Sequence, residues 1–290
     1  MSPRVFLITG TSTGFGNELV KVVLSKGDIA VATARNPDKL NFEGTNEKNY
    51  LPVRLDVTDP KSIDEAFKTT VDKFGRVDVV VNNAGYGLSG EFESFADDQI
   101  RTQMEVNFFG LINVTRKGEL ESQICHTNDV PALEIMRDLK TGGLIQQVTS
   151  MGGQVGVPTY SIYCASKWAV EGFTETLAQE LKPEWNIKLS CIEPGGFRTD
   201  WAGRSMVFGE RHPAYDHINA KANAEKRNGT QPGDPAKGAA AMYEFAIMQD
   251  PPLRAAVGTD AYQRIMKKLD TYKENYPKYE KLSNSTDVDE

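Results

Sequence analysis

Residues 9–16 read Thr9-Gly10-Thr11-Ser12-Thr13-Gly14-Phe15-Gly16 and decide the fold of this 290-residue chain. They follow directly on the apolar run Arg4–Thr9, which is typical of a strand, and they lead into Gly16–Ser25, which reads as a helix. Glycines let the backbone approach a pyrophosphate closely, and the N-terminus of a helix offers free N–H groups and a positive dipole end. A tight strand-to-helix turn can also be purely structural. In this context, at the start of the chain, the stretch predicts a phosphate-binding turn.

Short β-branched runs alternate with amphipathic segments along the rest of the chain. Further strands are predicted at Ile29–Ala34, Val53–Leu55, Val77–Val81, Gly143–Thr149, Ile187–Ile192 and Leu253–Val257. Helices are predicted from about Pro60, from about Asp97, at Ser161–Leu181 and at Ala236–Met248. This alternation predicts an α/β fold: one Rossmann-like domain over residues 1–290, with a doubly wound parallel sheet and helices on both faces.

Three segments interrupt this alternation. Residues 197–233 follow the carboxyl end of a strand, where ligands bind in open α/β sheets, and are expected to form a substrate lid loop. The polar residues 117–130 are expected to bulge to the surface as an insertion, before a helical pattern resumes at Pro131. Residues 281–290 are polar and acidic and are expected to be a frayed tail.

The composition excludes several classes of function. The net charge is −7 and the sequence pI about 5.2, which argues against nucleic acid as the main partner, since phosphate backbones need a basic face. No apolar run is long enough to span a bilayer, no cleavable signal is recognisable, and the three cysteines form no CxxC pair, so a cytoplasmic location is expected. His126, His212 and His217 complete no ligand spacing, and no metal is expected.

Further motifs follow the glycine turn in order along the chain. They are Asp56-Val57, Asn82-Asn83-Ala84-Gly85, Asn107 within Val106-Asn107-Phe108, Ser150, Tyr163-Cys164-Ala165-Ser166-Lys167 and Pro194-Gly195-Gly196-Phe197-Arg198-Thr199. With the turn, which has the form TGxxxGxG, they resemble the short-chain dehydrogenase/reductase family through at least Trp201. The stretches ATARNPDKL and PGGFRTDW look most like its hydroxysteroid- and retinol-dehydrogenase-like branch, which contains many enzymes of unknown substrate.

The resemblance implies a dinucleotide cofactor that is bound along these motifs. The residues expected to bind it are Gly10, Ser12, Gly14, Phe15, Gly16, Arg35, Asp56, Val57, Asn83, Ala84, Gly85, Tyr163, Lys167, Pro194, Gly195, Phe197 and Thr199. Within this set, the family pattern implies that Asp56 contacts the adenine and that the segment from Pro194 to Thr199 holds the nicotinamide.

Arg35 determines which cofactor is expected. NAD enzymes of this type generally place an acidic residue at the end of the second strand, where this chain has Thr33-Ala34-Arg35-Asn36. The planar guanidinium fits a 2′-phosphate, and losing one charge-assisted hydrogen bond, worth roughly 1.5–3 kcal/mol, costs roughly 10- to 150-fold in affinity. The alternative is a solvated surface arginine. The sequence therefore predicts NADP(H) as cofactor.

Tyr163 and Lys167 are four residues apart and so project from one face of a helix. To exchange protons near neutrality, the phenol must be acidified by about three units, or roughly 4 kcal/mol, and a neighbouring ammonium and an oxidised nicotinamide ring act in that direction. The resemblance implies that Tyr163 is the general acid/base, that Ser150 binds the substrate oxygen, that Lys167 also holds the nicotinamide ribose, and that Asn107 supports a water connecting Lys167 to solvent.

The substrate is expected to be a carbonyl or alcohol on a hydrophobic body, because most candidate substrate-facing residues are apolar or aromatic. They are Met151, Tyr86, Thr159, Trp201, Met206 and Phe208, for which ordinary lid packing is an equal alternative. Three other functions stay open: a catalytically idle NADP-binding sensor, an NAD-dependent alcohol dehydrogenase, and a sugar-nucleotide epimerase, although epimerases generally carry a larger C-terminal domain.

The insertion also bears on assembly. The resemblance implies that the long helical stretch from about Asp97 forms a dimer interface through a four-helix arrangement, which needs a smooth face. Because residues 117–130 interrupt that stretch, a monomer, or a dimer through another surface, is expected.

Overall fold

The computed structural model describes residues 2–116 and 132–288. The expected insertion at residues 117–130 therefore lies outside the described residues. Short turns of 3-10 helix lie at Pro37–Lys39, Phe92–Ser94, Met151–Gly153, Pro183–Trp185, Asp200–Ala202, Pro213–Tyr215, Tyr276–Tyr279 and Asn284–Thr286.

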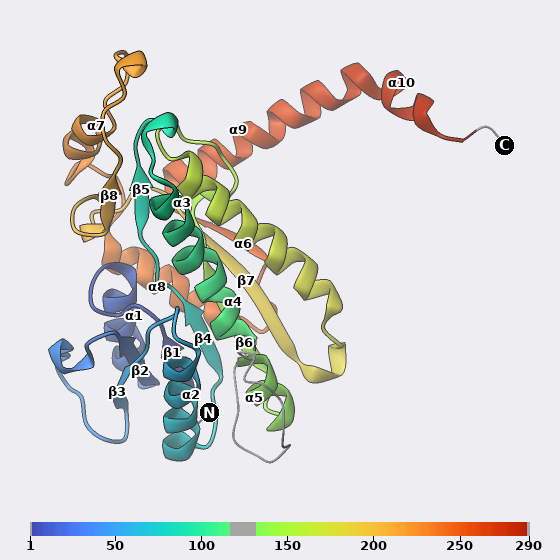
Figure 1. Ribbon diagram of the computed structural model, residues 1–290. Coiled ribbons are helices and arrows are strands. Elements are labelled where there is room, and N and C mark those ends of the chain that lie inside the picture. The colour runs from blue at the N-terminus through green and yellow to red at the C-terminus, as the bar shows by residue number, and fades with distance from the viewer. Residues whose placement is uncertain (1, 117–131, 289–290) are drawn as a thin grey trace.

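A seven-stranded sheet forms the centre of the molecule (Figure 1). Its strands are β1 (Val5–Ile8), β2 (Ile29–Ala34), β3 (Tyr50–Arg54), β4 (Val79–Asn82), β6 (Gly143–Val148), β7 (Ile187–Pro194) and β9 (Arg254–Val257). They lie in the order β3-β2-β1-β4-β6-β7-β9, and every neighbouring pair is parallel. The order runs outward in both directions from β1, which confirms the predicted doubly wound parallel sheet.

Helices cover both faces of the sheet because the strands are apolar on both sides. On one face, Phe6 and Ile8 of β1 pack against α1 (Gly14–Ser25) and α8 (Pro235–Ala246). On the other, Val5 and Leu7 pack against a second group of helices. These are α2 (Pro60–Phe74), α4 (Gly110–Thr115), α5 (Ala132–Asp138) and α6 (Ser161–Glu180). Alternate residues of one strand thus enter opposite cores.

The helical stretch predicted from Asp97 is not one regular helix. It comprises α3 (Asp97–Met104), a π-helical turn at Glu105–Phe109 and α4. The backbone of Arg116 is extended, with φ −107° and ψ 167°, so the helix ends at Thr115. The π-turn carries Asn107, in line with the frequent occurrence of such turns at functional sites.

The segment expected as a lid loop, residues 197–233, contains regular structure. Within it are β8 (Met206–Phe208) and α7 (Ala220–Arg227). Strand β8 pairs in parallel with β5 (Gly87–Ser89), which follows β4, and forms a separate two-stranded sheet. This pairing attaches the segment to the body of the molecule next to the carboxyl ends of the central strands.

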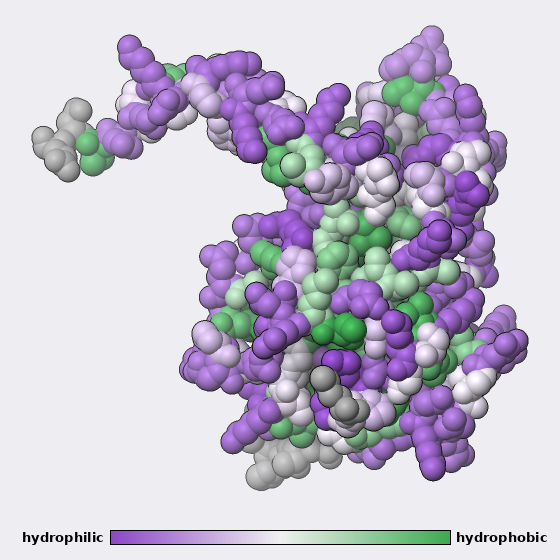
Figure 2. Space-filling model, turned by 180° about the vertical axis from the view of Figure 1, so that it is seen from behind, coloured by the Kyte–Doolittle hydropathy of each residue, from purple (hydrophilic) through white to green (hydrophobic). Residues whose placement is uncertain are grey.

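The C-terminal helix α9 (Thr259–Asn275) was not predicted. It continues through a turn into α10 (Glu280–Ser283), and together they form an arm that leaves the body of the molecule (Figure 1). Seen from behind, the arm projects away from the body of the molecule and carries mostly hydrophilic side chains (Figure 2). The fraying predicted for residues 281–290 stays a prediction. No helix among residues 2–116 and 132–288 is long and apolar enough to cross a membrane.

Candidate active site

A cleft of about 1260 Å³ opens at the carboxyl ends of the central strands. Most of the residues predicted to bind the cofactor or to act in catalysis line it: Gly10, Ser12, Gly14, Phe15, Arg35, Asp56, Val57, Asn83, Ala84, Gly85, Ser150, Tyr163, Lys167, Pro194, Gly195, Phe197 and Thr199. Two predicted residues, Gly16 and Asn107, do not line the cleft and lie behind its wall.

The turn between β1 and α1 has the geometry of an anion site. Gly10 and Gly14 have φ values of 69° and 62°, in the left-handed region that favours glycine. A Cβ on Gly10 would lie 2.9 Å from the Cα of Ala84, so the turn is in close contact with the loop after β4. The N-cap residue of α1, Thr13, makes no side-chain capping hydrogen bond, and the first turn has no acidic residue. The free N–H groups and the helix dipole therefore suit a bound phosphate.

Gly16 and Asn83 hold this turn in place. The Nδ2 of Asn83 donates to the carbonyl oxygens of Thr9 and Gly10, at 2.9 and 3.0 Å. A Cβ on Gly16 would lie 2.5 Å both from that Nδ2 and from the Gly10 oxygen. The observed role of Gly16 is thus close packing between the two loops, and a direct contact between Gly16 and a cofactor stays a prediction.

Arg35 and Asp56 lie together at the end of the cleft formed by β2 and β3. Arg35 is exposed and lines the cleft. Burial acts to raise the pKa of Asp56, but hydrogen bonds from the N–H and hydroxyl of Thr58, at 3.0 and 2.8 Å, and the charges of Arg35 and Arg54 lower it below its ordinary value. The guanidinium of Arg35 therefore offers a positive charge to the cleft close to the ionised carboxylate of Asp56.

The predicted catalytic side chains meet where β6 and α6 face the cleft. The hydroxyl of Tyr163 is hydrogen-bonded to the side chain of Ser150, whose Oγ accepts from the N–H of Gly152 at 2.9 Å. The Nζ of Lys167 donates to the carbonyl oxygen of Val148 at 2.8 Å and lies 5.9 Å from the centroid of the Tyr163 ring. The structure thus brings Ser150, Tyr163 and Lys167 together in one wall.

Burial dominates the ionisation of both groups. It raises the pKa of Tyr163 well above the usual value for a phenol, and the hydrogen bond with Ser150 offsets only part of this rise. It also lowers the pKa of Lys167 to about 8, although the charge of Glu171 acts to raise it. The acidification of the phenol that we expected from its lysine neighbour is thus outweighed by desolvation, and the protein by itself keeps the phenol of Tyr163 neutral.

Asn107 acts on the backbone of the loop after β4. Its Oδ1 accepts from the N–H of Tyr86 at 3.1 Å, and its Nδ2 donates to the Tyr86 oxygen at 3.0 Å and to the Oγ of Ser166 at 3.3 Å. These bonds connect the loop to α6, one residue before Lys167. The support of a water by Asn107 stays a prediction.

The segment after β7 is held by a residue that the sequence analysis missed. The Oδ2 of Asp260, in the first turn of α9, accepts from the N–H of Gly196 at 2.8 Å. A Cβ on Gly195 would lie 2.1 Å from the other oxygen of Asp260. Phe197 packs edge-on against Phe15 of α1, with 4.8 Å between the ring centroids. Asp260 thus fixes the segment that the family pattern assigns to the nicotinamide.

Only some of the predicted substrate-facing residues reach the cleft. Tyr86, Met151 and Trp201 line it, but Thr159, Met206 and Phe208 do not. Met206 is buried beneath the wall in a cluster with Tyr160 and Tyr163. The ring centroid of Trp201 lies 5.2 Å from that of Tyr163, so Trp201 borders the phenol ring directly.

Other residues in the wall were not predicted. They are Thr13, Ala34, Leu55, Thr58, Asp98, Gln99, Arg101, Thr102, Glu105, Val106, Val148, Thr149, Gly152, Val157, Tyr160, Cys164, Gly196, Arg204, Ser205, Val207, Ala224, Arg227 and Gln231. The residues in this list that adjoin a predicted motif in the sequence could have been found from the motifs alone. Val207, Ala224 and Arg227 could not, because they enter the wall through the unpredicted strand β8 and helix α7. In the part of the chain that the structure describes, no group of His, Cys, Asp and Glu residues could hold a metal ion.

Comparison with known proteins gives consistent matches. The family model for short chain dehydrogenases matches residues 4–206. An uncharacterized oxidoreductase of Schizosaccharomyces pombe is 39% identical over 285 residues, which cover 98% of this chain and 92% of the relative. A 3-ketodihydrosphingosine reductase of Bacteroides thetaiotaomicron is 33% identical, with 89% of each chain covered. The crystal structure of a short-chain dehydrogenase from Streptomyces avermitilis is 33% identical, has a TM-score of 0.84, and covers 99% of this chain and 100% of its own.

Proposed function

The chain belongs to the short-chain dehydrogenase/reductase family, whose members are oxidoreductases with a nicotinamide cofactor, and we propose that it uses NADP(H) to interconvert a carbonyl and an alcohol on a hydrophobic small molecule. One observation carries the proposal. Ser150, Tyr163 and Lys167 meet in one wall of a cleft that the glycine turn and Arg35 also line.

In the proposed reaction, the nicotinamide when bound gives hydride to the substrate carbon or takes hydride from it. Tyr163 protonates the substrate oxygen in reduction and takes the proton back in oxidation. The neutral phenol that burial favours suits the donating step. Ser150 donates a hydrogen bond to the same oxygen and fixes its position beside Tyr163. Lys167 places a positive charge behind the phenol from a site where Val148 fixes its Nζ.

The preference for NADP(H) rests on Arg35. Arg35 is exposed at the end of β2, lines the cleft and acts electrostatically on Asp56, so it lies where the adenosine end of the cofactor is expected. A guanidinium there can form charge-assisted hydrogen bonds to a 2′-phosphate. An NAD-dependent enzyme is the alternative, and direct comparison of the affinities for NADPH and NADH separates the two.

The hydrophobic character of the substrate rests on the wall beside Tyr163. Trp201 stacks on Tyr160 with 5.9 Å between ring centroids, and Val157 and Val207 extend the apolar surface. The relative from Bacteroides is a 3-ketodihydrosphingosine reductase, which agrees with a keto substrate. A panel of hydrophobic ketones and aldehydes, with free sugars as controls, should show oxidation of NADPH by the ketones or aldehydes only. Binding of NADPH without a single turnover on any of them would indicate a catalytically idle sensor.

The proposal extends to organisation and location. We propose that residues 1–290 form one catalytic domain in the cytoplasm. The buried free thiols of Cys164 and Cys191 suit a reducing compartment. A single cooperative unfolding transition followed by two independent probes would support the one domain, and cell fractionation tests the location.

A further inference from the structure

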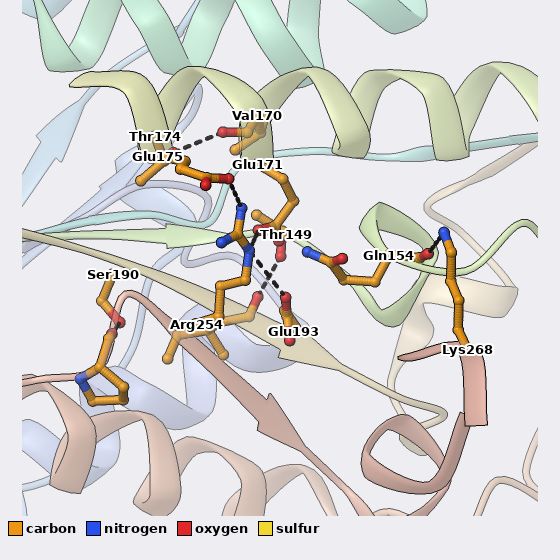
Figure 3. Close-up of polar contacts among 12 residues, drawn as sticks. Thr149, Gln154, Val170, Glu171, Thr174, Glu175, Ser190, Glu193, Arg254 and Lys268 are labelled. Atoms are coloured by element: carbon orange, nitrogen blue, oxygen red, sulfur yellow. Dashed lines mark hydrogen bonds and ion pairs between the residues drawn. The ribbon is translucent and has the colours of Figure 1, made fainter. Parts of the chain in front are cut away.

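A cluster of charged side chains lies between α6, β7 and β9 (Figure 3). It lies behind the wall of the cleft that Ser150, Tyr163 and Lys167 form. At its centre are Glu171 and Glu193, which we call the carboxyl pair, and each residue is only 3% exposed. Glu171 belongs to α6. Glu193 directly precedes Pro194, the first residue of the segment Pro194–Thr199 that is expected to hold the nicotinamide. The mechanism above uses neither of them, and two buried carboxyl groups need a compensating charge or a proton.

Arg254 supplies the compensating charge, but it is shared among three carboxyl groups. Its Nε donates to the Oε2 of Glu171 at 2.9 Å, and its Nη2 donates to the Oε2 of Glu175 at 2.6 Å. Its Nε also lies 4.0 Å from the Oε1 of Glu193. Glu175 lies at the rim, with a side chain that is 52% exposed, whereas the pair is enclosed. One guanidinium therefore faces two buried carboxyl groups and one that solvent also reaches.

The surroundings of the pair favour one bound proton. The Oε1 atoms of Glu171 and Glu193 are buried, and neither accepts a hydrogen bond from an N–H or O–H of the described residues. Both carboxyl groups approach the Nε of Arg254, Glu171 at 2.9 Å and Glu193 at 4.0 Å, and each residue is only 3% exposed. Two buried carboxyl groups that share one cation repel each other when both are ionised, and one shared proton relieves that repulsion, as in the paired carboxyl groups of other buried sites. Burial, with the charge of Glu171, raises the pKa of Glu193 to about 7, while contacts with Gln154 and Arg254 lower it.

The pair is linked to the catalytic lysine through α6. Tyr163, Lys167 and Glu171 follow one another at intervals of four residues and so lie on one face of the helix. The charge of Glu171 acts on Lys167 and raises its pKa, against the larger opposite effect of burial. Since the ammonium of Lys167 donates to an uncharged carbonyl oxygen, Glu171 is the carboxylate that offsets its burial.

We propose that Glu171 and Glu193 share one proton and that the charge of this pair, placed one helical turn beyond Lys167, sets the ionisation of the catalytic lysine. Glu171 and Glu193 are thus positioning residues, and their importance for catalysis rests on the proposed function of Lys167. The groups that face the pair are Lys167 and Glu175 from α6, Cys191 from β7, Gln154 from the loop after Ser150, and Arg254 from β9. Lys268 of α9 donates to the backbone oxygen of Gln154 and closes the cluster on that side.

The direction of the effect follows from the charges. While the pair holds its proton, it carries one negative charge near Lys167. When the pair loses the proton as the pH rises through about 7, it carries two, and the second charge stabilises the ammonium in the higher pH range where burial alone would deprotonate it. The pair therefore extends the pH range in which Lys167 stays positively charged.

A carbon-13 NMR titration of the protein, labelled at glutamate Cδ and lysine Cε, tests the proposal without a substrate. The parent should show a coupled carboxyl titration with a step near pH 7, and Glu193→Gln should remove that step. Glu171→Gln should lower the pKa of Lys167 by about one unit or more, the effect expected for loss of a neighbouring opposite charge. The Lys167 signal is assigned by its disappearance in Lys167→Met.

Glu175→Gln is the matched control, because it removes a carboxylate from the same helix and the same arginine but leaves the pair intact. It should keep the carboxyl step and should change the Lys167 titration by much less than Glu171→Gln does. A parent protein whose glutamates all titrate in the ordinary range overturns the shared proton, even if the variants do not fold. An unchanged Lys167 titration in Glu171→Gln overturns the link to the lysine. Neither result touches the assignment of Tyr163, which is tested by turnover.

Discussion

Asn107 holds the backbone of Tyr86 from both sides, accepting from its N–H at 3.1 Å and donating to its carbonyl oxygen at 3.0 Å. Tyr86 lines the cleft, while Asn107 is 1% exposed in the π-turn between α3 and α4. The buried amide therefore gives the loop after β4 a fixed position relative to α6.

This relationship predicts a loss of stability in Asn107→Ala. The change leaves the partly buried N–H of Tyr86 without its partner, whereas the Tyr86 oxygen keeps the bond from the Nε2 of Gln103 at 3.0 Å, and one unsatisfied group costs about 1–3 kcal/mol. The free energy of unfolding in urea should fall by about 1–3 kcal/mol. Asn284→Ala in the exposed C-terminal turn should stay within about 0.5 kcal/mol of the parent. Equal stability of the two variants would contradict a structural role for Asn107.

The second prediction concerns the cofactor. Arg35→Ala should weaken NADPH binding by roughly 10- to 150-fold and leave NADH binding nearly unchanged, because only NADPH offers the 2′-phosphate. Titrations of both cofactors should use one low salt concentration, since exposed charges are screened. Arg54→Ala is a suitable control, as Arg54 also acts on Asp56 but does not line the cleft. Equal affinities of the parent for the two cofactors would refute the preference for NADP(H).

Two helix glycines give a matched pair for the third prediction. Gly16→Ala should weaken the binding of both cofactors, since a Cβ there lies 2.5 Å from Asn83 and displaces the glycine turn. Gly172→Ala in α6 meets no atom within 4 Å and should raise stability by up to about 1 kcal/mol without changing binding. Unaltered affinity in Gly16→Ala would show that the turn tolerates this displacement.

The fourth prediction is a pH dependence of stability. Burial lowers the pKa of Lys167 to about 8 from an ordinary value of 10.5, so between these pH values the unfolded chain binds more protons than the folded one. The contribution of Lys167 to the free energy of unfolding must therefore increase as the pH rises. Relative to Lys167→Met, the parent should gain about 2 kcal/mol between pH 8 and 10. Subtracting the free energy of unfolding of Lys167→Met from that of the parent cancels the titration of Cys164 and Cys191. A difference in free energy that does not change with pH would contradict the lowered pKa of Lys167.

The fifth prediction concerns assembly. The sequence places a polar insertion at residues 117–130, after the helical stretch that the family resemblance assigns to a dimer interface. Light scattering should therefore show a monomer, or a dimer that is insensitive to substitutions on the exposed face of α4. A stable tetramer would be contrary to this expectation.

The meeting of Ser150, Tyr163 and Lys167 in one wall, and the glycine turn, could be predicted because their signals are local. Tyr163 and Lys167 lie one helical turn apart, and the turn around Gly14 follows a strand directly. Strand β8 has only three residues, which is too short for a periodic pattern. Helix α9 has one fully buried residue, Ala261, and therefore no continuous apolar face that faces the core.

The contacts that join distant segments could not be predicted from the sequence. Asp260 lies 64 residues beyond Gly196, and no pattern in either segment indicates the other. Glu171 did offer a signal, since it continues the four-residue interval of Tyr163 and Lys167, but a glutamate on a helix is usually exposed. Only the approach of β7 and β9 to α6 shows that Glu171 is buried and shares Arg254 with Glu193.

In the proposed reaction Tyr163 transfers the proton, and single-turnover reduction of a good hydrophobic ketone by NADPH measures this step. Tyr163→Phe keeps the ring that packs against Trp201 but removes the phenolic proton. The variant should bind NADPH within a few-fold of the parent, and its rate of NADPH oxidation should fall by at least about 100-fold, the usual contribution of a general acid. Oxidation of NADPH by Tyr163→Phe within a few-fold of the parent rate would contradict proton transfer by Tyr163.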